Sequence, residues 1–216
     1  MKPEQTVNNY EKWCRIWQER FLTLDQSALL RKLPELTVED DYLTFFYLHR
    51  KHGIHRATGQ ILSFENDEPL SIFARLNIYT LLWYCRENIH LQNNWVPFRS
   101  LKDASPFGPA FQNTVIDIYS ATFSGHTAEL RAAFEKLGGK KLPHSDAGYE
   151  LQAFACIPVR FLFWDGDDEF PAQSNILFDT SATDCIHVES LVSIADEAVV
   201  LLAKLAGIPL KGKTFT

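Results

Sequence analysis

The chain has 216 residues, of which 46% are hydrophobic, so it can bury the core of one large domain or two small ones. Its formal net charge of −6 argues against a general nucleic-acid binder, which normally carries a basic surplus. The first residues lack the apolar segment of a signal peptide, and no run of about 18 apolar residues occurs, so we expect a cytoplasmic protein that does not enter a membrane.

The four cysteines, Cys14, Cys85, Cys156 and Cys185, are far apart in the sequence. Secreted disulfide frameworks and zinc or iron–sulfur sites use clustered cysteines, whereas this chain contains no C-x-x-C pair. We therefore expect four small buried side chains, and no metal, cofactor or iron–sulfur cluster held by this chain alone.

Two helices are predicted within residues 5–33. The first has an aromatic and apolar stripe at helical spacing, which is typical of core packing. The stripe comprises Tyr10, Trp13, Cys14, Trp17, Phe21 and Leu24. Asp25 begins a second, shorter helix, and Pro34 ends it.

A hairpin is predicted over residues 42–62, because residues 43–48 and 54–62 have the composition of strands and Gly53 can supply the turn. The predicted tip carries His49, Arg50, Lys51, His52, His55 and Arg56. The three histidines resemble a metal tripod, but the three cations beside them oppose a metal ion. A solvated basic hairpin is favoured, with an anion or acidic-partner patch as the alternative.

Further helices are predicted over residues 69–137. The sequence Asn66-Asp67-Glu68-Pro69 has the features of a helix start. The helix that follows it, to about Asn88, is apolar around most of its circumference, which is typical of a central buried helix. Trp95 to Phe98 predicts a short extended segment, because Pro97 is unfavourable in a regular helix.

The C-terminal part, residues 149–206, predicts strands at 149–154, 159–164 and 175–178, then a helix. The strand at 159–164 is apolar on both faces except for Arg160, which places it inside a sheet. An unpaired buried charge is costly, so we expect a buried Arg160 paired with Glu150 or Asp179. The whole chain, 1–216, is thus predicted as one α+β domain with a mostly antiparallel sheet of about four to five strands, packed by helices that include one central buried helix.

The turn at residues 165–169 carries Asp165, Asp167, Asp168 and Glu169. Carboxylates suit Ca²⁺ or Mg²⁺, but the position of Gly166 does not fit a calcium-binding loop, and Asp-Gly is a hairpin turn signal. Paired carboxylates can also act as acid and base when burial separates their pKa values, although a tip this polar should be exposed. We predict a rigid hairpin tip that requires no divalent cation.

Residues 148–182 carry an F-x-x-x-P-V strand, a W-x-G-D-x-E-F-P turn and an N-I-L-F-D-x-S-A strand and cap. In these motifs the chain resembles a family of uncharacterised proteins, a domain of unknown function found mainly in anaerobic bacteria and archaea. The resemblance covers roughly residues 70–203. Some relatives carry an added four-cysteine iron–sulfur segment, similar to that of corrinoid iron–sulfur proteins of one-carbon metabolism, and this chain lacks it. The resemblance implies no catalytic residues.

Two functions remain open. The first is a non-catalytic binding or accessory module of anaerobic metabolism, with a redox or one-carbon enzyme as its protein partner by analogy with the family. Its candidate ligand or partner surface comprises Trp95, Arg160, Trp164, Asp165, Asp167, Asp168, Glu169 and Phe170. The second is a small metal-dependent or acid/base enzyme that uses the turn 165–169. No nucleophile elbow, P-loop, dinucleotide-binding glycine motif or H-E-x-x-H motif occurs, so the first is favoured.

Overall fold

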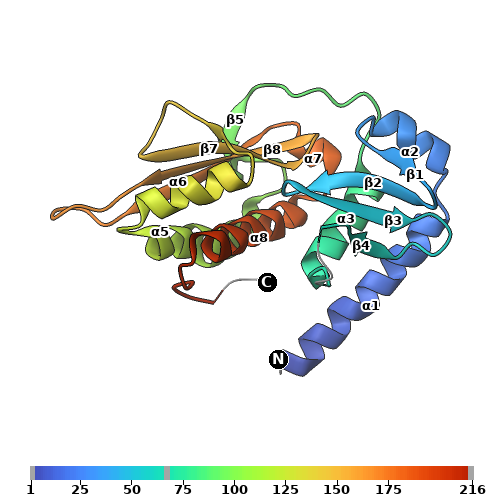
Figure 1. Ribbon diagram of the computed structural model, residues 1–216, viewed down its shortest axis with the longest axis horizontal. Coiled ribbons are helices and arrows are strands. Elements are labelled where there is room, and N and C mark those ends of the chain that lie inside the picture. The colour runs from blue at the N-terminus through green and yellow to red at the C-terminus, as the bar shows by residue number, and fades with distance from the viewer. Residues whose placement is uncertain (1–2, 66–68, 214–216) are drawn as a thin grey trace.

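Two antiparallel sheets lie next to each other, with helices packed on them, in the computed structural model of the chain (Figure 1). The structure describes residues 3–65 and 69–213, and side chains from residue 9 onward. The fold is of the α+β class, as predicted, but its strands form two sheets where one was expected.

The first sheet has the order β1-β2-β3-β4. Its strands are β1 (Thr37–Glu39), β2 (Tyr42–Tyr47), β3 (Arg50–His55) and β4 (Ile61–Ser63). The second sheet has the order β5-β9-β8-β7-β6. Its strands are β5 (Trp95–Pro97), β6 (Lys140–Lys141), β7 (Ala147–Phe154), β8 (Ile157–Trp164) and β9 (Gln173–Asp179).

The α-helices are α1 (Pro3–Leu22), α2 (Gln26–Lys32), α3 (Ile72–Tyr84), α4 (Gly108–Phe111), α5 (Asp117–Phe123), α6 (Thr127–Lys136), α7 (Ala182–Cys185) and α8 (Val188–Ala206). Short 3-10 turns lie at Phe98–Ser100 and Ser105–Phe107, and a π-helical turn lies at Gln112–Ile116. No described helix is both long and apolar enough to cross a membrane.

Helix ends follow local signals in the sequence. Asp25 caps α2 by accepting hydrogen bonds from the amides of Ser27 and Ala28, and Gly207 ends α8 at φ 71°. Helix α3 is capped by Ser71, whose hydroxyl accepts from the amide of Ala74. Residues 66–68 of its predicted start lie outside the described residues, Pro69 precedes the helix, and the helix ends at Tyr84, before the predicted end at Asn88.

The predicted turn at Gly53 is wrong. The chain reverses at Leu48 and His49, which have φ angles of 47° and 63°, as a tight two-residue hairpin turn requires. Gly53 lies inside β3, opposite Thr44, where a Cβ atom would come within 2.4 Å of the Phe64 ring. The glycine therefore permits the ring to pack on the strand, and the predicted basic tip is instead spread along β3.

The second sheet buries one face against α5, α6 and α8, as Figure 1 shows. Val159, Phe161 and Phe163 of β8 point to this side and are almost fully buried. The prediction that β8 is buried on both faces is wrong, because Arg160 is half-buried and Trp164 is 40% exposed on the outer face. The alternation of inner and outer positions in β8 is not visible in the sequence, because apolar residues also occupy the outer positions.

The two sheets meet where β2 ends beside the end of β7. The Leu48 amide donates to the Ala153 carbonyl oxygen at 3.0 Å, and the rings of Tyr47 and Phe154 stack with centroids 4.7 Å apart. Helix α8 contacts α3 at one end and α6 at the other, so it spans the junction. One cluster of buried side chains includes residues of both sheets.

Candidate functional site

Arg160 lies on the outer face of the second sheet, where it contacts Glu150 and Trp95. Its guanidinium Nε donates to Glu150 Oε2 at 2.9 Å, across the β7–β8 register pair, which confirms the predicted pairing with Glu150. The guanidinium carbon also lies 3.7 Å from the centroid of the Trp95 ring, a cation–π contact. Arg160 is only half-buried, with 30% of its side chain exposed.

Asp179, the alternative partner, has a structural role. Its carboxylate accepts hydrogen bonds from the amides of Gln92, Asn94 and Ser181 and from the Ser181 hydroxyl. Burial raises the pKa of Asp179, but these donors outweigh it and the pKa is lowered. The carboxylate thereby ties the loop before β5 to the end of β9.

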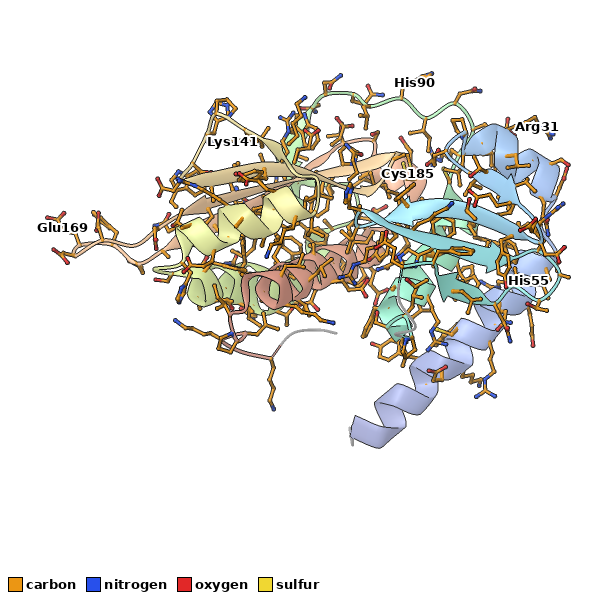
Figure 2. The ribbon with its side chains drawn as sticks, viewed as in Figure 1. Arg31, His55, His90, Lys141, Glu169 and Cys185 are labelled. Carbon is orange, nitrogen blue, oxygen red and sulfur yellow. The ribbon has the colours of Figure 1, made fainter. Side chains whose placement is uncertain are left out.

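The acidic turn forms the end of an arm that projects from the second sheet, with Glu169 at its tip (Figure 2). Asp165 accepts from the amides of Gly125 and Gly166 and from the Thr127 hydroxyl. Asp167 accepts from the amides of Glu169 and Phe170. These two carboxylates therefore hold the arm in shape, and Asp168 and Glu169 remain exposed.

The basic segment is distributed over both faces and both ends of β3. Lys51 forms an ion pair with Glu39 at 2.7 Å, His55 Nδ1 accepts from the Ala57 amide, and Arg56 donates to Gln26. His49 is the second residue of the hairpin turn and lies against Gly138. Among the residues that the structure describes, no three His, Cys, Asp or Glu side chains are arranged to hold a metal ion.

A partly buried polar network lies at the junction of the sheets, around the half-buried Glu197 of α8. Tyr47 donates to Oε2 at 2.5 Å, Asn77 donates to the same oxygen at 3.2 Å, and the Ser71 hydroxyl donates to Oε1. The Asn77 side-chain oxygen accepts from the Ser193 hydroxyl at 2.8 Å. Residues from β2, α3 and α8 are therefore joined through one carboxylate.

The electrostatics of this network oppose ionisation of Glu197. Burial raises the pKa of Glu197, and the three donors that stabilise the charged form only partly offset it. The pKa of Tyr47 is raised well above its usual value by burial and by the neighbouring Glu197. A carboxyl group of this kind holds its proton more readily than a surface glutamate.

The Glu197 carboxyl group forms part of the wall of a cavity of about 390 Å³. The cavity has polar and apolar walls, and α8 and β3 supply most of its charged groups. Its lining comprises Tyr47, Leu48, Arg50, His52, Ser63, Pro69, Leu70, Ser71, Ala74, Glu197, Val200, Leu201 and Lys204. Two residues of the predicted basic segment, Arg50 and His52, thus belong to this cavity.

His52 points into the protein from the middle of β3 and is only 5% exposed. Burial lowers the pKa of His52 to about 4, so its imidazole is neutral at physiological pH. Its Nδ1 atom has no hydrogen-bond partner in the part of the chain that the structure describes. A buried nitrogen without a partner next to a cavity is a ready contact for a ligand.

Sequence reasoning missed Glu197, Tyr47, Ser71 and Asn77. One signal was present, since Asp196 and Glu197 interrupt the otherwise apolar segment of the last helix. Acids on the buried side of a helix require partners, and therefore mark a polar site.

These features define an α+β protein with two antiparallel sheets and a polar cavity at their junction. The chain belongs to the family described as a domain of unknown function (DUF3786), which matches residues 30–200. The match confirms the predicted membership in a domain family of unknown function, and it extends over the first sheet, beyond the predicted range. No curated protein and no solved structure matches the chain.

Proposed function

We propose that the protein is a non-catalytic binding module that takes a small organic anion into the Glu197 cavity. The observation that carries the proposal is a half-buried carboxyl group, with three donors, in the wall of a cavity of ligand size. Burying an ionisable group costs several kcal/mol, and an apolar side chain would give a more stable structural contact. A role in binding accounts for that cost.

The lining of the cavity indicates the chemistry of the ligand. Arg50 and Lys204 bring two cationic groups to it, which favours a carboxylate or phosphate. Leu70 and Val200 provide apolar surface for a short aliphatic body. Glu197 suits a hydroxyl or amino group at the far end of the ligand, because such groups hydrogen-bond to a carboxyl group in either protonation state.

A thermal-shift screen tests the proposal. The probes are short aliphatic hydroxy acids and dicarboxylates, each paired with its neutral amide. A ligand at about 100 times its dissociation constant stabilises the native state by about 2.7 kcal/mol, which raises the melting temperature by roughly 5–10 °C for a domain of this size. We expect such shifts with acids and not with the matched amides.

Variants then locate the site. Arg50→Gln should abolish the shift caused by an acid, and Glu197→Gln should reduce it for the hydroxy acids. Arg160→Gln serves as the matched control, since it also removes a cation but lies on the outer face of the second sheet and does not line the cavity. Shifts that persist in Arg50→Gln, or that are absent with every probe, would contradict the proposal.

The alternative, an enzyme that uses the turn 165–169, has less support. The carboxylates of Asp165 and Asp167 are already engaged by backbone amides and by the Thr127 hydroxyl, so they lack the freedom of a general base or a metal ligand. The Glu197 cavity offers the more suitable chemistry.

We also propose that the outer face of the second sheet and its arm bind a protein partner in the cytoplasm, such as a redox or one-carbon enzyme. The specific observation is exposed aromatic surface, since Trp164 is 40% and Phe170 is 62% exposed, on either side of the acidic turn. Replacement of both by serine should abolish co-purification of a defined partner without lowering the melting temperature. Equal recovery of that partner with the variant would contradict the assignment.

A further inference from the structure

Three of the four cysteines come together at the junction, although they are far apart in the sequence. Cys85 follows α3, Cys156 lies in the turn between β7 and β8, and Cys185 ends α7. Figure 2 shows Cys185 on α7, beside the first sheet. Tertiary contacts assemble this trio, which the spacing of the cysteines in the sequence does not predict.

Direct contacts define this assembly. The Sγ atom of Cys185 lies 3.5 Å from the carbonyl oxygen of Cys156. Arg86 and Asp184 are the sequence neighbours of Cys85 and Cys185. The Arg86 amide donates to the Asp184 carbonyl oxygen at 3.2 Å, and the two side chains form an ion pair at 2.7 Å. The thiols of Cys156 and Cys185 both interact with the Cys85 thiol.

A carboxyl group from a fourth segment completes the cluster. Glu35 interacts with the thiol of Cys156, and burial raises the pKa of Glu35. Its Oε1 atom is buried and has no hydrogen-bond partner of ordinary geometry among the described residues. A buried carboxylate oxygen without a hydrogen-bond partner can receive the proton of a reacting thiol or of water.

The three thiols differ in access to solvent. Cys85 and Cys185 are 2% and 0% exposed, whereas Cys156 is half-buried in its turn. Cys156 is therefore the thiol that a small solute meets first.

We propose that this trio is a peroxide-reactive dithiol site, in which Cys156 and Cys185 form a reversible disulfide. The Cys156 sulfur attacks one oxygen of the peroxide while its proton passes to the Glu35 carboxylate, whose buried Oε1 atom is available to accept it. The O–O bond breaks, and Cys156 becomes a sulfenic acid as the second oxygen leaves as hydroxide, which is protonated to water.

The Cys185 sulfur then attacks the sulfenic sulfur. The S–S bond forms and the S–O bond breaks, and the departing hydroxide takes a proton to give a second water molecule. In total two thiols lose two electrons and two protons, and hydrogen peroxide is reduced to two water molecules. An external thiol restores both cysteines by disulfide exchange.

Mass spectrometry of the full chain tests the site. The reduced protein is treated with hydrogen peroxide at a one-to-one ratio, blocked with N-ethylmaleimide and digested. We expect a linked Cys156–Cys185 peptide and a fall in free thiols from four to about two, reversed by dithiothreitol. Because the measurement uses the unmodified protein, it does not depend on the folding of a variant.

Variants assign the roles. Glu35→Gln should slow disulfide formation at least about tenfold, because the proton acceptor is lost. In Cys185→Ser, dimedone should trap a sulfenic acid at Cys156. Cys14→Ser is the matched control, since Cys14 lies apart in α1, with its Sγ atom 3.7 Å from the Ile72 carbonyl oxygen, and it should react as the wild type does.

Several outcomes would overturn the proposal. Absence of the linked peptide would do so, as would oxidation of all four thiols at equal rates or linkage of Cys156 to a different cysteine. Stoichiometric zinc in the purified protein, with the trio protected from maleimide, would replace the dithiol site with a metal site.

Discussion

At the scale of single residues, Glu197 determines the character of the cavity. Its carboxyl group is held by Tyr47, Asn77 and Ser71, and these donors favour the charged form. Burial has the opposite effect and is larger, so the pKa is raised above the ordinary value of 4.5. The folded protein therefore binds a proton at Glu197 more tightly than the unfolded chain does.

This difference makes stability depend on pH. The stability that the protonated Glu197 contributes is complete below about pH 4.5 and is lost as the pH rises through the folded pKa. The glutamine in Glu197→Gln cannot ionise. The free energy of unfolding of this variant should therefore rise relative to that of the wild type as the pH increases from about 4.5 through the folded pKa. The gain is about 1.4 kcal/mol for each unit by which folding raises the pKa.

Urea unfolding of both proteins between pH 4 and pH 8 measures the gain. Glu189→Gln in the same helix is the control, because Glu189 is exposed and no comparable change is expected. Wild-type and Glu197→Gln curves that stay parallel over the whole range would show that folding does not shift the proton affinity of Glu197.

At the scale of elements, Arg160 connects strands across the outer face of the second sheet. Arg160 of β8 pairs with Glu150 of the adjacent strand β7. It also stacks on Trp95 of β5, which is separated from β8 by β9. Removal of one partner of a fully buried ion pair lowers the free energy of unfolding by about 3–5 kcal/mol. Here 30% of the Arg160 side chain and 14% of the Glu150 side chain are exposed, so water compensates for part of the loss.

We expect Arg160→Met to lower the free energy of unfolding by about 1–2 kcal/mol. Combination with Glu150→Gln should recover about half of this loss, because the orphaned carboxylate is removed as well. A double-mutant cycle by urea denaturation measures both values. Additive effects of the two substitutions would show that the ion pair contributes nothing to stability.

The arm between β8 and β9 is held by its own hydrogen bonds. Asp165 binds the Gly125 amide and Thr127 hydroxyl, which fixes the base of the arm to the start of α6. Asp167 accepts two backbone amides within the turn. These donors occupy both oxygens of Asp165 and one oxygen of Asp167, which leaves fewer carboxylate oxygens for a divalent cation.

Calcium, magnesium or manganese at millimolar concentration should therefore change the melting temperature by no more than about 1–2 °C, whereas a micromolar site would raise it by roughly 8–16 °C. The comparison variant carries Asp168→Asn and Glu169→Gln, which removes the exposed charges and leaves the hydrogen bonds of the turn in place. A large shift in the wild type that this variant loses would identify a cation site.

At the scale of the whole molecule, the two sheets share one core. Tyr47 stacks on Phe154, Leu48 bonds to Ala153, and α8 contacts helices of both halves. Separate domains would meet through a smaller and more polar interface. The cavity and the cysteine trio both lie at this junction, so both require the two halves to be assembled.

We expect the chain to unfold in a single cooperative transition. Trp13, Trp17 and Trp83 report on the N-terminal half, and Trp95 and Trp164 on the second sheet, whereas far-UV circular dichroism reports on all elements. The fluorescence and dichroism curves in urea should coincide, as a two-state transition requires. Two separated transitions would show that the sheets belong to independent domains.

The sequence by itself determined the elements whose signals are local. The stripe of Trp17 and Phe21 predicts α1, Asp25 and Gly207 mark helix ends, and apolar or aromatic runs identify β2, β7, β8 and β9. It also predicted a carboxylate partner for Arg160, Glu150 or Asp179, of which the structure selects Glu150, and it predicted the membership in a family of unknown function. These features depend on side chains that are close in the sequence, or on a charge whose burial demands a partner.

Only the tertiary structure decided how distant segments meet. The division into two sheets, the reversal at Leu48 and His49, the network around Glu197 and the approach of Cys156 to Cys185 all involve such contacts. Periodicity specifies which face of an element is buried, but not which segment covers it, because many partners satisfy the same apolar face. Packing of the whole chain selects one arrangement, and the cavity and the thiol cluster exist only in that arrangement.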